Sequence, residues 1–222
     1  MGKKSSSYLF LSFPRWSQFT KAIEDGEISF EEMGYSCQFQ QFLRVTNRFR
    51  AACGLESSNF HRTINELTAR GYHELILHFM MYSCLERYMI DCCGYQPNDW
   101  HNKRMRWSVA ELGEIQKFIV ESDKDGEVFN FLIGELKSEI EVDRNKSEAA
   151  IRYLTRFYSG TDFNNWYVLS RALRNFFVHG DLTANPGKVK AETLIPIVRA
   201  LSIHIRDTIR NDFNARLSPL ID

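Results

Sequence analysis

The chain carries one short block of residues whose chemistry suits a phosphodiester, Arg174 to Gly180 (Arg-Asn-Phe-Phe-Val-His-Gly). Arginine holds a permanent, forked positive charge that matches phosphate oxygens. Histidine is the side chain whose proton moves most readily near neutral pH. Together, Arg174 and His179 could therefore bind a phosphodiester and move a proton on it.

The spacing within this block decides whether one helix can present both groups. Arg171, Arg174 and Asn175 are three or four residues apart, so they share one face of a helix. His179 follows Arg174 by five residues, which is about 140° around a helix of 3.6 residues per turn. For both to reach one phosphate, the helix must end before His179 or two copies of the chain must meet. Gly180 suits a helix end, because glycine readily adopts left-handed backbone angles.

The block resembles the R-x4-6-H signature of the HEPN superfamily, in which a polar residue directly follows the arginine. Arg174-x4-His179 fits this signature, with Asn175 in second place and Gly180 after the histidine. The resemblance is specific over Arg174–Gly180 and loose elsewhere. It implies an all-α bundle that forms a homodimer. It also implies a metal-independent endoribonuclease of a defence or toxin–antitoxin system, with RNA and an antitoxin protein as partners and no cofactor.

This resemblance gives each residue of the block an expected role. The 2′-hydroxyl of the RNA attacks the adjacent phosphate, and His179 acts as general base or acid. Arg174 stabilises the charge that develops on the phosphate. Asn175 orients the phosphate or the histidine, and Arg171 adds positive field. In dimeric members two such motifs face a shared cleft, so we expect a symmetric dimer.

A second point of resemblance lies upstream, at Cys84-Leu85-Glu86. HEPN domains often carry a glutamate on an earlier core helix within a small-Leu-Glu pattern. Glu86 shares a stripe with apolar residues, and a carboxylate on such a face is costly unless it is paired. Arg174 is the natural partner, so Glu86 is expected to hold Arg174 in place.

Two other interpretations of these residues compete with the nuclease. In the first, the chain is a helical nucleotide-binding or protein-interaction module without catalysis, Arg174 and Glu86 form a core ion pair, and His179 caps a helix end. In the second, His73 and His78 bind a metal, as in a zinc protease helix. Their spacing of five residues rather than four puts them on different faces, and no third ligand follows. No metal site is therefore expected.

Apolar residues repeat at helical spacing almost throughout the chain. Helices are predicted at about 16–24, 30–52, 57–70, 72–92, 108–119, 128–140, 147–158, 163–178 and 191–213. Gly71 is expected to separate two of them, and residues 122–126 to form a turn. The pattern predicts an all-α multi-helix bundle in a single domain over 1–222. In it, residues 1–70 form an N-terminal helical extension of a HEPN-like bundle over 71–222.

Composition narrows the setting in which the chain works. Its 28 basic and 28 acidic residues cancel, so the whole chain is no generic polyanion binder. Residues 144–222, which carry the block, hold twelve bases and seven acids. Five cysteines without a C-x-x-C motif indicate reduced thiols and hence a cytoplasmic protein. The sequence shows neither a signal peptide nor an apolar span long enough for a membrane helix.

Two further segments carry weaker signals. Residues 100–107 interleave bases and aromatic residues, a pattern that could stack on single-stranded nucleic acid. We favour a surface loop anchored by its tryptophans. The first six residues fit a loose myristoylation pattern, which we interpret as a flexible basic start.

Overall fold

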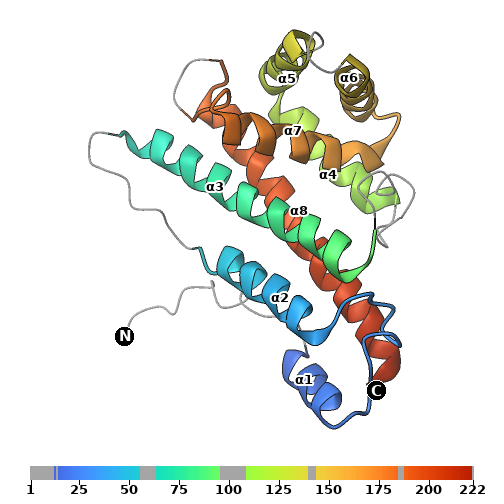
Figure 1. The fold of residues 1–222 in the computed structure, drawn as a ribbon. Helices are drawn as coiled ribbons and strands as arrows, with labels where there is room; N and C mark the ends of the chain where they lie inside the picture. Colours follow the sequence, from blue (N-terminus) through green and yellow to red (C-terminus); the bar gives the residue numbers. More distant parts are fainter. Residues whose placement is uncertain are drawn as a thin grey trace. The chain divides into compact units, whose positions relative to one another are not determined.

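The computed structural model describes residues 13, 15–55, 64–95, 109–139, 144–184 and 188–221 of the chain. Every regular element within these ranges is a helix, which confirms the predicted all-α multi-helix class (Figure 1). The α-helices are α1 (Trp16–Glu24), α2 (Phe39–Cys53), α3 (Glu66–Arg87), α4 (Val109–Ser122), α5 (Glu127–Ser138), α6 (Arg144–Tyr158), α7 (Trp166–His179) and α8 (Ala191–Leu217). Short helical turns of other types are η2 (Tyr88–Cys92, π), η5 (Phe163–Asn165, 3-10) and η6 (Ser218–Leu220, 3-10).

The helices group into two compact units, and each unit is assembled from separate stretches of the chain. The first unit holds residues 1–57, 83–106 and 204–222, and the second holds residues 58–82 and 107–203. The long helices α3 and α8 contribute to both units. The predicted division into an extension and a bundle within one domain remains a prediction.

The first unit is built around an aromatic core. The Phe13 and Phe213 rings lie edge to face with centroids 4.8 Å apart, and Phe19 meets Phe213 in the same way at 5.3 Å. Phe42 is fully buried among them. Such offset contacts are favourable because the positive ring edge meets the negative ring face. Aromatic residues of the sequence therefore form much of the packed core of the first unit.

A series of hydrogen bonds between polar side chains runs through the same unit and ends in the ion pair of Asp212 and Arg216. The hydroxyls of Tyr35 and Tyr88 lie 2.6 Å apart, and Tyr88 donates to Asp212 Oδ2 at 2.7 Å. Arg216 Nε donates to the same carboxylate oxygen at 2.7 Å, and its Nη1 donates to the carbonyl of Gly34 at 2.8 Å. Buried polar groups need such partners, so the chain of bonds fixes how these segments pack.

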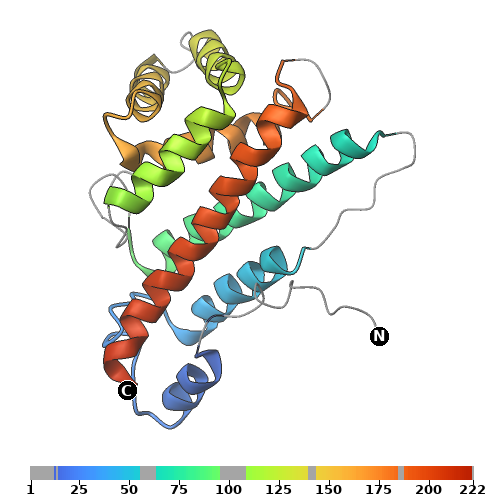
Figure 2. The same cartoon turned by 180° about the vertical axis from the view of Figure 1, so that it is seen from behind.

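The second unit contains α4 to α7 with the first parts of α3 and α8. Helices α5 and α6 lie side by side (Figure 1), and the first half of α8 lies between α3 and α4 (Figure 2). The predicted turn at 122–126 is confirmed, with Gly126 at φ 66°. Asp123 accepts hydrogen bonds from the backbone N–H groups of Val128 and Phe129 and from the Tyr158 hydroxyl. This carboxylate caps α5 and joins it to α6.

One predicted boundary is wrong. Gly71 does not end a helix, because α3 runs from Glu66 to Arg87 without a break. A Cβ atom at Gly71 would lie 2.7 Å from the Cβ atom of Ala184. The glycine is therefore needed for close packing of α3 against the segment after α7, and not for a turn.

Two other helix bounds differ from the predicted ones. Helix α2 begins at Phe39 rather than near residue 30, because Gly34 takes a positive φ angle of 70° in the turn before it. Helix α8 continues through Pro196 to Leu217. Proline has no N–H group, so it cannot donate to the Glu192 carbonyl one turn earlier.

Candidate functional site

Helix α7 presents the Arg-His block, and its apolar residues hold it in the second unit. Leu169 and Leu173 are fully buried, and the Phe176 ring lies edge to face with that of Phe131 at 5.9 Å. A 3-10 turn precedes the helix, and the Asp162 carboxylate caps it by accepting from the Asn164 N–H at 3.1 Å.

The end of α7 lies at Gly180, as predicted. Gly180 has φ 85°, in the left-handed region that glycine favours, and its N–H group points back to the carbonyls of Phe176 and Phe177. His179 is the last helical residue, and it is exposed. Its imidazole is therefore open to solvent at the tip of the helix.

Arg174 lies in a different environment from His179. Its side chain is half-buried, and Nη1 donates to the Asn175 side-chain oxygen at 2.8 Å. The guanidinium carbon lies 5.8 Å from the centre of the Phe79 ring and 5.9 Å from that of Tyr82, both on α3. Aromatic ring faces attract cations at this range. Asn175 and the two rings thus orient the guanidinium group.

The remaining predicted site residues fall in separate places. Arg171 is exposed one turn before Arg174 on α7. Glu86 is half-buried near the end of α3 and belongs to the first unit, whereas Arg174 belongs to the second. The Glu86–Arg174 pair therefore remains a prediction.

Arg174 and His179 of one chain could reach the same phosphate only if the helix ended before His179, and this condition is not met. Helix α7 does not end before His179, because it includes that residue. Arg174 and His179 thus keep the separation of about 140° that a continuous helix imposes. The remaining condition for a joint phosphate site is the approach of a second copy of the chain.

One of the two histidines of the metal interpretation, His78, takes part in structural hydrogen bonds. His78 is buried, with Nε2 3.1 Å from the Ser170 carbonyl oxygen and Nδ1 3.3 Å from the Ser202 hydroxyl. Burial lowers the pKa of His78 to about 4, because it disfavours the charged form. Within the described ranges, no group of three or more His, Cys, Asp or Glu side chains is placed to hold a metal ion.

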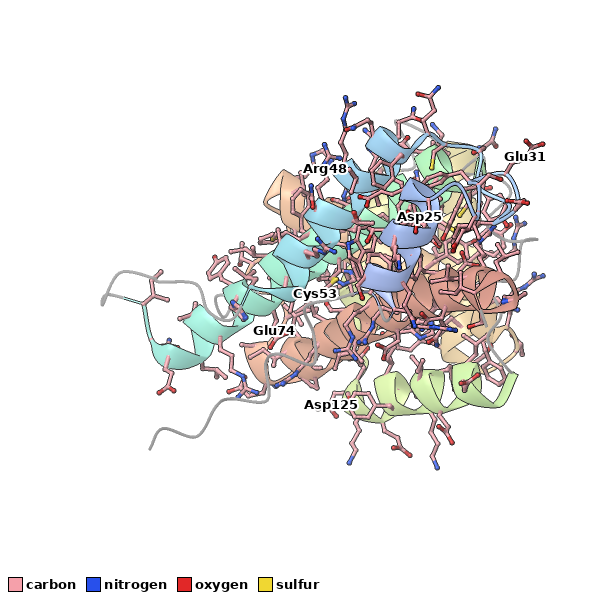
Figure 3. All side chains as sticks on the ribbon, turned by 90° about the horizontal axis from the view of Figure 1, so that it is seen from below. Asp25, Glu31, Arg48, Cys53, Glu74 and Asp125 are labelled. Carbon is pink, nitrogen blue, oxygen red and sulfur yellow. The ribbon has the colours of Figure 1, made fainter. Side chains whose placement is uncertain are left out.

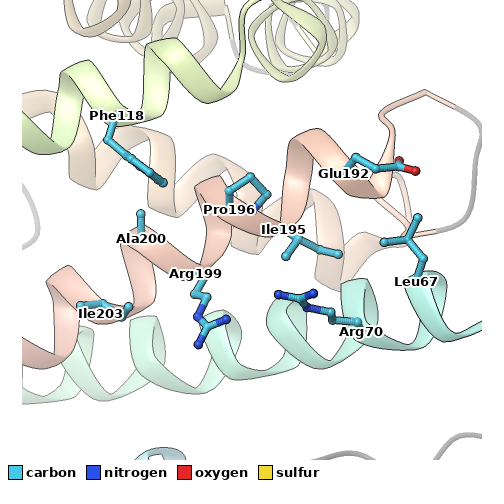
Figure 4. Close-up of a pocket in the computed structure, with 9 residues that line it drawn as sticks. All are labelled: Leu67, Arg70, Phe118, Glu192, Ile195, Pro196, Arg199, Ala200 and Ile203. Carbon is cyan, nitrogen blue, oxygen red and sulfur yellow. The ribbon is translucent and has the colours of Figure 1, made fainter.

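A groove away from the Arg-His block was not anticipated from the sequence. A groove of about 480 Å³ lies in the second unit, over the first half of α8 (Figure 4). Its wall carries Arg70 from α3 and Arg199 from α8. The available signal was the set of apolar residues on α8, Pro196 and Ala200 among them, that falls outside the main apolar stripe of that helix.

Several sequence-based expectations fall outside the described residues. These include the basic and aromatic segment at 100–107 and the myristoylation pattern at the first six residues. In the part of the chain that is described, no helix is both long enough and apolar enough to cross a membrane.

Comparison with known proteins leaves the chain without an assigned relative. No protein-family model, no curated protein and no solved structure matches it.

Proposed function

We propose that this chain is a metal-independent endoribonuclease of the HEPN type that acts as a symmetric dimer. The observation that carries the proposal is the arrangement on α7. An exposed His179 is the last residue of the helix, while Arg174, five residues earlier, is oriented by its own neighbour Asn175. A proton-transferring group and a fixed guanidinium are the two functions that phosphodiester cleavage needs.

The reaction uses the 2′-hydroxyl of the RNA as the nucleophile. His179 takes the proton of this hydroxyl, and the 2′ oxygen forms a bond to the adjacent phosphorus. The bond from phosphorus to the 5′ oxygen breaks, and the leaving oxygen takes a proton from the imidazolium or from water. The products are a 2′,3′-cyclic phosphate and a 5′-hydroxyl. Arg174 stabilises the negative charge that builds up on the phosphate oxygens during the attack.

A second copy completes the site in this proposal. Within one chain, Arg174 and His179 leave α7 on different sides. A two-fold axis near the tip of α7 brings Arg174 of one copy toward the same residue block of the other, so each phosphate meets a histidine and an arginine from different chains. The exposed Val178, beside His179, is an apolar residue available to such a contact.

The resemblance extends the proposal to the cellular setting. It suggests a cytoplasmic enzyme of a defence or toxin–antitoxin system, restrained by an antitoxin protein. Glu86 has the role of holding Arg174, and Arg171 adds positive field beside it.

One observation favours a non-catalytic alternative. Arg174 is half-buried over two aromatic rings, which is also the environment of a structural arginine. In this alternative the chain is a helical nucleotide-binding or protein-interaction module, and the exposed His179 has no chemical role.

A test of RNA cleavage in the presence of EDTA distinguishes the nuclease from the non-catalytic module. The proposal expects the protein to cut RNA without a divalent metal and to leave cyclic phosphate ends, and expects His179→Ala to abolish the cleavage. His73→Ala is the matched control, because it also removes an imidazole but one outside the block, and it should leave cleavage intact. Equal cleavage by the wild type and His179→Ala, or no cleavage of a broad panel of RNAs, would overturn the proposal.

A further inference from the structure

The groove over α8 collects an unusual share of the exposed apolar surface of the second unit. It is lined by Leu67, Arg70, Phe118, Glu192, Ile195, Pro196, Arg199, Ala200 and Ile203. Leu67, Phe118 and Ile203 are 38%, 47% and 41% exposed, and they are three of only five large hydrophobic side chains that are exposed among the described residues. Three different helices supply them. Apolar side chains gathered in this way mark a binding surface more often than scattered ones do.

Residues with short side chains, Pro196 and Ala200, form the floor of the groove. Pro196 and Ala200 lie one turn apart on the same side of α8, and Ile195 packs beside them (Figure 4). Without bulky side chains here, a ligand can approach the helix closely. Phe118 of α4 forms one wall, and Leu67 of α3 stands on the opposite side.

Two positive charges converge at the α3 side of this floor. The Arg199 side chain points from α8 toward α3, and the Arg70 side chain leaves α3 toward α8, so both guanidinium groups lie between the two helices (Figure 4). Neither forms a hydrogen bond or salt bridge with another residue of the described ranges. An anion between two nearby guanidinium groups offsets their mutual repulsion, and their forked donors match the oxygens of a carboxylate or phosphate.

Two carboxylates near the groove, those of Glu74 and Glu192, bear on whether the arginines can bind an anion. Glu74 projects from α3 (Figure 3) and is buried, and its burial raises the pKa of its carboxyl group, an effect that Arg199 partly opposes. One Oε atom of Glu74 has no hydrogen-bond partner. Glu192 lies at the Leu67 end of the groove, with its carboxylate directed away from the two arginines (Figure 4). Of these two carboxylates, Glu74 is the one whose pKa Arg199 and Arg70 influence.

We propose that this groove is a binding site for a small amphipathic organic anion. Its carboxylate or phosphate group lies between Arg70 and Arg199, and its aliphatic or aromatic body covers Pro196 and Ala200 and contacts Phe118. A volume of about 480 Å³ falls within the range of roughly 300–1,000 Å³ that small-molecule sites occupy, and a mostly apolar lining with a few charged groups is typical of them. No residue of the groove belongs to the α7 block, so the site does not depend on the proposed nuclease.

The test compares ligands that share a tail or a head group. Isothermal titration calorimetry with the full chain uses decanoate and decyl phosphate, each below its micelle concentration. Decyltrimethylammonium carries the same tail with the opposite charge, and inorganic phosphate carries the head group alone. The proposal expects one saturable site for the two anions, and at least about tenfold weaker binding of the other two probes.

Substitutions of groove residues test whether the anion binds in the groove. Arg70→Gln combined with Arg199→Gln should weaken anion binding by at least about tenfold, because two charge-assisted contacts are lost. Both side chains are exposed, so the fold should persist, which circular dichroism checks. Arg152→Gln is the matched control, since it removes one exposed arginine of α6 outside the groove. Ala200→Trp should block the floor and abolish binding.

Four results would overturn the proposal. The first is tight binding of the cationic probe. The second is anion binding that the arginine variant leaves unchanged. The third is the absence of saturable binding to the folded protein. The last is anion binding that Ala200→Trp leaves unchanged, which would place the ligand outside the groove.

Discussion

Arg174 and His179 lie on one uninterrupted helix, yet their positions are about 140° apart around its axis. Arg174 faces the aromatic rings of α3, and His179 projects into solvent at the helix tip. A helix that stopped one residue earlier would have freed His179 to turn toward the arginine. The two groups can therefore share a phosphate only if another copy of the chain takes part, which makes the nuclease proposal also a proposal about assembly.

Asn175 should influence the reaction through Arg174. Its side-chain oxygen accepts from Arg174 Nη1 at 2.8 Å, and Asn175→Ala removes this one contact that orients the guanidinium group. We expect about tenfold slower RNA cleavage, because an imprecisely held charge stabilises the transition state less well. The melting temperature should change little, since the bond lies only partly buried between neighbouring residues. Unchanged cleavage by a folded variant would remove Asn175 from the site.

Gly71 and Ala184 should behave as a coupled pair. Gly71→Ala improves helix propensity by about 1 kcal/mol, but it places a methyl group 2.7 Å from the Ala184 Cβ atom. Overpacking of a buried contact costs about 1–3 kcal/mol, so we expect a net destabilisation. Urea denaturation of the two single variants and the double variant Gly71→Ala/Ala184→Gly measures it. The double variant should recover part of the loss, and strict additivity would show that the two sites do not touch.

His78 should make the protein less stable in acid. Its pKa is about 4 in the folded protein against an ordinary value of 6.5. Between these two values the unfolded chain binds the extra proton, so this group lowers the free energy of unfolding as the pH falls from 6.5 to 4. The difference of 2.5 pH units corresponds to about 3 kcal/mol.

The variant His78→Gln isolates this contribution. Glutamine keeps a donor for the Ser170 carbonyl and does not titrate. Urea denaturation at several pH values should show the wild type losing more stability than the variant between pH 6.5 and 4. Parallel pH profiles of the two proteins would mean that His78 is not the group responsible.

The sequence predicted what depends on local pattern. Helical periodicity gave the class, and Gly180 gave the end of α7, because a left-handed helix end depends on its own residues. Gly71 was misjudged as a break because its role is set by Ala184, more than a hundred residues later in the chain. The groove was missed for the same reason, since Arg70, Phe118 and Arg199 come from three helices that only the fold brings together.

The measurement that tests the central proposal most directly is complementation between two inactive variants. Arg174→Ala and His179→Ala should each fail to cut RNA in EDTA. When the two are unfolded together and refolded as a mixture, half of the dimers are expected to be mixed, and each mixed dimer holds one site with both an intact arginine and an intact histidine. Cleavage should then return to about a quarter of the wild-type rate, as this statistical mixing of a two-fold assembly requires. A mixture as inactive as its two components, formed under conditions where the refolded wild type cuts RNA, would contradict a site shared between two chains.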